Sequence, residues 1–84
     1  MEKISPQQLK AARALAGLTQ ADVCERAGVS IVTLRRLESQ SFYADMVATQ
    51  TLEKVRRVLE EVGVEFLGPE DFSGGYGVAI RGDA

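Results

Sequence analysis

The chain has 84 residues, of which 45% are apolar and 26% are charged, proportions typical of a soluble globular protein. Its length allows one domain, residues 1–84, and argues against a deep catalytic cleft. It contains no histidine and a single cysteine, Cys24, which excludes histidine-based catalysis, an internal disulfide and most transition-metal sites. We therefore expect no enzyme activity, no catalytic residue and no metal or other cofactor.

The net charge of −2 is unevenly distributed along the chain. Residues 1–38 carry six basic and four acidic side chains, whereas residues 39–84 carry four basic and eight acidic ones. A nucleic-acid-binding face is therefore expected in the first half, although so modest an asymmetry also arises by chance. No apolar stretch has the length of a signal peptide or a membrane span, which predicts a cytoplasmic protein with no membrane contact.

The first predicted helix spans residues 6–16. Ser5 stands at its N-cap, Pro6 at its first position and Gln8 at its third, a combination typical of helix starts. Gly17 is expected to end it. The apolar residues that recur at helical spacing are Leu9, Ala12, Leu15 and Ala16. This spacing is that of an amphipathic helix.

Two short helices are predicted next. Thr19 caps the second helix, which is about eight residues long and ends at Gly28. Ser30 caps the third helix. The expected core contacts are Val23, Cys24 and Ala27 on the second helix and Leu34 and Leu37 on the third. Because Gly28 and Val29 alone separate these helices, we expect them to cross steeply rather than lie antiparallel.

Residues 39–48 are predicted to form a long connection, with room for one helical turn around residues 43–47. The side chains expected to cover the core from this segment are Phe42, Tyr43 and Met46. A fourth helix is predicted over residues 50–62, capped by Thr49 and ended by Gly63. Its expected buried stripe consists of Leu52, Val55, Leu59 and Val62.

After residue 63 the apolar pattern changes to a period of two, which is typical of strands. The alternating apolar residues are Val64 and Phe66, then Val78 and Ile80. A segment rich in turn residues, GPEDFSGGYG, lies between them. The sequence therefore predicts a mainly α fold, with a helical part at residues 5–62 and a β-hairpin extension at residues 63–81.

The segment most informative about function is residues 19–38. Cys24 is a small residue at the expected closest approach of two helices, and Gly28 suits a turn that needs a positive φ. Cys24 is expected to be a core residue rather than a redox sensor. With Val29, Leu34 and Leu37 facing the core, the outer residues of the third helix are Ser30, Ile31, Thr33, Arg35 and Arg36. These features indicate a helix-turn-helix, whose second helix enters the DNA major groove.

The stretch LKAARALAGLTQADVCERAGVSIVTLRRLE, residues 9–38, resembles the phage-repressor (Cro/CI-like, XRE-type) helix-turn-helix family. The lead-in spans Leu9 to Gln20, and the L-x-x-L-E close spans Leu34 to Glu38. The resemblance covers about residues 5–62 and implies a lambda-repressor-like DNA-binding bundle of four to five helices. The tail, GVEFLGPEDFSGGYGVAIR, resembles a subgroup of small bacterial regulators with a C-terminal GVEF…GV β-hairpin.

The resemblance also implies roles for individual residues. The expected DNA-binding residues are Gln20, Ser30, Ile31, Val32, Thr33, Arg35 and Arg36. Gln20 would hold a phosphate, and Arg35 and Arg36 would contact guanine or phosphate. Ile31 and Val32 stand at base-reading positions, but they are apolar, so that Ile31 would contact thymine methyl groups alone. A structural ion pair is expected between Arg13 and Glu38.

The favoured function is a sequence-specific DNA-binding transcriptional regulator that acts as a homodimer on a palindromic operator. The possible dimer interface consists of Val64, Phe66, Val78 and Ile80, because paired hairpins would cover their open edges. The hairpin would otherwise pack on the helices of its own chain. The alternative function is a protein-binding regulator, either the antitoxin of a toxin–antitoxin pair or an antagonist of another transcription factor. Exposed Ile31 and Val32 and the acidic second half favour that alternative.

Overall fold

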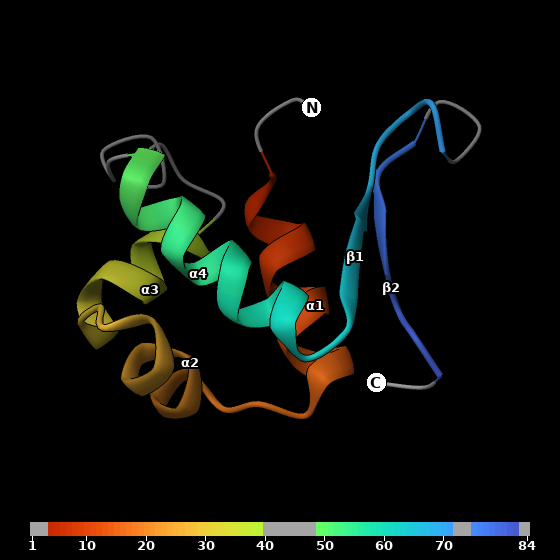
Figure 1. Ribbon diagram of the computed structural model, residues 1–84. Coiled ribbons are helices and arrows are strands. Elements are labelled where there is room, and N and C mark those ends of the chain that lie inside the picture. Colours follow the sequence, from red (N-terminus) through yellow and green to blue (C-terminus); the bar gives the residue numbers. More distant parts are fainter. Residues whose placement is uncertain (1–3, 40–48, 72–74, 83–84) are drawn as a thin grey trace.

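Three short helices in the first half of the chain each begin at a side-chain cap. A computed structural model describes residues 4–39, 49–71 and 75–82 (Figure 1). The first helices are α1 (Pro6–Ala16), α2 (Gln20–Ala27) and α3 (Ile31–Leu37). Each cap, Ser5, Thr19 or Ser30, accepts a hydrogen bond from the backbone N–H three residues further along. The bounds of α1 and α2 and the start of α3 agree with the predicted ones.

Helix α4 (Thr49–Glu61) begins and ends one residue earlier than predicted. Thr49 is its first helical residue rather than its cap. At the other end, the N–H groups of Val62 and Gly63 bond to carbonyls three residues back, and Gly63 has a φ of 99°. This tighter turn ends the α-helix before Val62. The connection at residues 40–48, with the expected cluster of Phe42, Tyr43 and Met46, lies outside the described residues.

A two-stranded antiparallel hairpin follows α4. Strand β1 (Val64–Leu67) pairs with β2 (Gly77–Ile80), so that Val64 lies opposite Ile80 and Phe66 lies opposite Val78. Figure 1 shows the hairpin beside α1, with α2 and α3 on the other side of the molecule. The predicted hairpin is confirmed, and α3 lies far from it.

The hydrophobic core joins all four helices to the hairpin. Its buried residues are Ile4, Leu9, Ala12, Val23, Leu34, Leu37, Leu52, Val55, Leu59, Val64 and Phe66. Val58, which the predicted stripe omitted, is buried as well, whereas Leu15 is 45% exposed. Leu15 lies about 100° around α1 from Ala16, which packs against the core in its place. No helix of the described residues is long and apolar enough to cross a membrane.

Gln8 connects the start of α1 to the loop end of the hairpin. Its Oε1 accepts a 3.0 Å hydrogen bond from the Ser5 N–H and completes a capping box. Its Nε2 donates to the backbone carbonyls of Leu67 and Gly77, both at 3.1 Å. Because Gln8 is 4% exposed, these bonds are made largely out of water, and they hold both strands at the pair where the ladder ends.

We expect Gln8→Met to lower the free energy of unfolding by about 1–3 kcal/mol, since two carbonyls lose a donor in a buried setting. Gln7→Met is the matched control, because Gln7 is exposed one position away on the same helix. Its effect is expected to stay within about 0.5 kcal/mol. Urea unfolding followed by circular dichroism measures both variants. Equal effects of the two substitutions would contradict the bridging role of Gln8.

Candidate nucleic-acid interface

The turn between α2 and α3 sets the direction of α3. Gly28 adopts a left-handed conformation, with φ 70° and ψ 35°, and its N–H bonds to the Cys24 carbonyl at 2.9 Å. The Val29 N–H bonds to the same carbonyl at 3.2 Å. A Cβ on Gly28 would meet nothing within 4 Å, so glycine is needed there for its positive φ rather than for space.

The first turn of α3 is held by two hydroxyl side chains. The Ser30 Oγ accepts a hydrogen bond from the Thr33 N–H at 3.1 Å and donates to the Thr33 Oγ1 at 2.8 Å. Both residues are predicted DNA contacts, and in the structure they stabilise the start of this helix. The Thr33 hydroxyl hydrogen is not used in this pair and can point toward a ligand.

One side of α3 is anchored and the other faces solvent. Leu34 and Leu37 are at most 2% exposed. On the opposite side, Val32 is 52% exposed, and Arg35 and Arg36 are exposed as well. Ile31 and Val32 are the two apolar residues predicted to contact bases. Ile31 is half-buried, so it is less accessible to a ligand than Val32. Val32 is therefore the better placed of the two for contact with a ligand.

A shallow, open depression of about 470 Å³ lies on this outer surface. The described residues that line it are Val32, Arg35, Arg36 and Ser39. None of these four side chains is acidic. The surface therefore combines two guanidinium groups with one apolar side chain, a composition suited to an anionic ligand that carries an apolar group.

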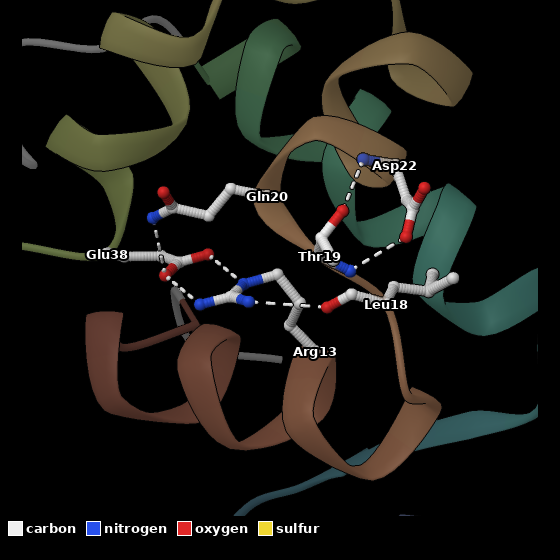
Figure 2. Close-up of polar contacts among 6 residues, drawn as sticks. All are labelled: Arg13, Leu18, Thr19, Gln20, Asp22 and Glu38. Atoms are coloured by element: carbon white, nitrogen blue, oxygen red, sulfur yellow. Dashed lines mark hydrogen bonds and ion pairs between the residues drawn. The ribbon is translucent and has the colours of Figure 1, made fainter.

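A buried carboxylate ties α3 to the preceding helices (Figure 2). Glu38, whose side chain is 4% exposed, accepts from Arg13 Nε at 2.8 Å and from Arg13 Nη2 at 3.0 Å. Arg13 also donates from Nη1 to the Leu18 carbonyl at 3.3 Å. The Glu38 carboxylate raises the pKa of Arg13 further above its ordinary value, so that the guanidinium stays charged. This fork-to-fork pair joins α1, the α1–α2 loop and the residue that follows α3.

Gln20 belongs to the same network. Its Nε2 donates to Glu38 Oε1 at 3.3 Å, as Figure 2 shows. The side-chain amide carries two N–H groups, and this bond uses one of them. Gln20 therefore keeps one N–H for the predicted phosphate contact, at a position fixed by Glu38. The sequence patterns did not indicate this bond.

Two titratable groups of α2 have perturbed pKa values. The backbone N–H of Thr19 lowers the pKa of the Asp22 carboxyl, which completes the capping box of α2. Burial raises the pKa of the Cys24 thiol, with a smaller contribution from Glu38. Cys24 thus stays protonated and packs against the core. Within the described ranges, no group of three or more acidic or cysteine side chains is arranged to hold a metal ion.

The residues predicted as a dimer interface belong to β1 and β2, which lie on the opposite side of the molecule from α3 (Figure 1). Val64 and Phe66 are 4% and 6% exposed within the core of their own chain. Val78 is half-buried, and Ile80 is 39% exposed. The hairpin therefore packs on its own helices, and Val64 and Phe66 present no side-chain surface to a partner.

Comparison with known proteins gives one family match. Residues 7–40 match the model of a family described as a helix-turn-helix domain. No match is found among curated proteins. The matched residues cover α2, α3 and nearly all of α1, and they include the Arg13–Glu38 pair and the depression on α3. This part of the chain is similar to helix-turn-helix domains, which supports DNA binding.

Proposed function

We propose that this protein is a sequence-specific DNA-binding transcriptional regulator that places α3 in the major groove of its operator. The observation that carries the proposal is the outer surface of α3, where Arg35 and Arg36 are exposed on a helix that Leu34 and Leu37 hold against the core. The family match over residues 7–40 supports it. In our proposal α3 reads the bases, and α2 crosses the phosphate backbone.

Each predicted contact has a proposed role. Arg35 and Arg36 bind guanine edges or phosphates, for which their planar guanidinium groups are suited. Gln20 donates its second amide N–H to a phosphate, and Ser30 and Thr33 offer hydroxyl groups at the start of α3. The Arg13–Glu38 pair keeps α3 in place relative to α1 without contacting DNA. These roles place a phosphate contact on α2 and base or phosphate contacts on α3.

We further propose that the protein binds a palindromic operator as a homodimer, because one short helix makes few base contacts. The interface is the open edge of β2, since β1 is the sole strand paired with β2 in the described sheet. The Arg81 N–H donates to the Gly63 carbonyl at 3.0 Å, so the backbone groups of Ile80 face the other edge. Val78 and Ile80 therefore replace Val64 and Phe66 as the side chains nearest a partner.

Ile80→Lys is expected to raise the dissociation constant of the dimer by about tenfold or more, because lysine on an edge strand opposes pairing. Sedimentation equilibrium over a range of protein concentrations measures it. Gln7→Lys is the control, because it adds the same charge at an exposed site on α1. If Ile80→Lys dimerised like the wild type, the interface would lie elsewhere. If the wild type were monomeric, the proposal of a homodimer would be wrong.

DNA binding itself is tested with the full chain and a pool of duplexes that have a randomised central region. We expect selection to enrich a duplex that the protein binds at least about a thousandfold more tightly than a scrambled one, with a steep dependence on salt. Fluorescence anisotropy at two salt concentrations measures both properties. A pool that never enriches would refute the proposal and favour the protein-binding alternative, for which exposed Val32 would be the contact.

A further inference from the structure

We propose that Val32 is a specificity-determining residue, which contacts the C5-methyl group of a thymine while Arg35 and Arg36 contact the neighbouring DNA. This inference rests on the proposed DNA-binding function. The sequence resemblance gives this kind of contact to Ile31. The exposure of the two side chains assigns it to Val32 instead, since Ile31 is half-buried and Val32 is 52% exposed.

The placement of Val32 carries the first step of the argument. Val32 is the most exposed of the large apolar side chains in the described residues. It precedes Arg35 by three positions and Arg36 by four, so all three share one face of α3. They line the same depression, together with Ser39. An apolar group is thus held beside two cations on an anchored helix.

The chemistry of the groove carries the second step. The isopropyl group of valine has no hydrogen-bond donor or acceptor, so it can distinguish bases by apolar contact alone. Of the groups that base pairs present in the major groove, the C5-methyl of thymine is the apolar one. The guanidinium groups on either side suit the phosphates and guanine edges that surround such a methyl group.

The charge around Val32 favours DNA over a protein as the occupant. No carboxylate is among the described residues that line the depression, and Glu38, the acidic residue next to Ser39 in the chain, is buried in its pair with Arg13. The described part of this surface therefore presents two exposed cations to an anionic duplex. A protein partner would need an acidic, apolar surface of its own, and such a partner is the competing outcome of the experiment below.

The experiment uses the full chain and the duplex enriched by selection. Each thymine is replaced singly by deoxyuridine, which removes the methyl group and leaves the hydrogen-bonding edge intact. We expect one thymine in each half-site to show a loss of affinity of about fourfold, the effect of one buried methyl-sized group. Val32→Ala is expected to lose a similar factor on the thymine duplex and to become insensitive to uracil at that position.

Leu15→Ala is the matched control, since Leu15 is 45% exposed on α1 and lies outside the depression. It should retain the affinity and the uracil profile of the wild type. The inference is overturned if no thymine is sensitive in the wild type, or if Val32→Ala keeps the sensitivity. Failure of selection to enrich any duplex would instead count against the proposed function, so the two failures are distinguishable.

Discussion

Arg13→Ala is expected to lower the free energy of unfolding by about 2–3 kcal/mol, less than the loss of about 3–5 kcal/mol for breaking a fully buried ion pair, because the Arg13 side chain is 22% exposed. The Glu38 side chain is 4% exposed, so its carboxylate cannot regain full hydration when the guanidinium is removed. The substitution also removes the N–H group that bonds to the Leu18 carbonyl. It leaves the Glu38 carboxylate, which Gln20 contacts, without the guanidinium that holds it in place. Urea unfolding measures the change.

Two further variants test whether this loss comes from the unpaired Glu38 carboxylate. The double variant Arg13→Met/Glu38→Met is expected to be more stable than Arg13→Ala, because no buried charge is left unpaired. Glu60→Gln breaks an exposed pair, in which Arg56 Nε and Glu60 Oε2 are 3.1 Å apart, and should cost at most about 0.5 kcal/mol. If Arg13→Ala were no worse than Glu60→Gln, the Arg13–Glu38 pair would not hold α1 to α3.

The Arg56–Glu60 pair also accounts for an unfavourable feature of the sequence. Glu60 lies in the last turn of α4, where the helix dipole disfavours a negative charge. A cation one turn earlier offsets that effect, since Arg56 and Glu60 are four positions apart. The pair is a local feature of α4 and requires no function of its own.

Helix starts and ends were predictable because the signals are local. Ser5 and Thr19 are each followed three positions later by a residue that completes a capping box, and Gly28 supplies the positive φ at the end of α2. These signals act within four residues, so they do not depend on how the rest of the chain folds. The predicted bounds of α1 and α2 and the predicted start of α3 therefore agree with the structure.

Contacts between distant residues were less predictable. Gln8 lies 59 and 69 positions from the two carbonyls that it bridges, and no pattern near Gln8 indicates them. The alternating pattern of β1 also allowed Val64 and Phe66 to face either the helices of their own chain or a second copy, and the sequence did not distinguish the two. The structure has them facing their own helices. The exposure of Val32 rather than Ile31 depends on the rotational position of a seven-residue helix, which Leu34 and Leu37 fix through the core.

Arg35→Ala combined with Arg36→Ala is expected to weaken selective DNA binding strongly. Each arginine that holds a guanine edge contributes about 1–3 kcal/mol of discrimination, so the two together account for at least about thirtyfold in affinity. Where they contact phosphates instead, the salt slope falls by about 2 for each protomer. Anisotropy titrations at two salt concentrations separate these cases. Both side chains are exposed, so the melting temperature should not change.

Two control variants distinguish the roles of the arginines from the effect of charge alone. Lys54→Ala/Arg57→Ala removes two exposed cations from α4 and should leave selective binding nearly unchanged. Arg35→Lys/Arg36→Lys keeps the charge but removes the planar fork, so it should retain the salt slope and lose discrimination between sequences. If the double alanine variant bound like the wild type, α3 would not be the reading element. The exposed surface around Val32 would then be better explained as a protein-binding site.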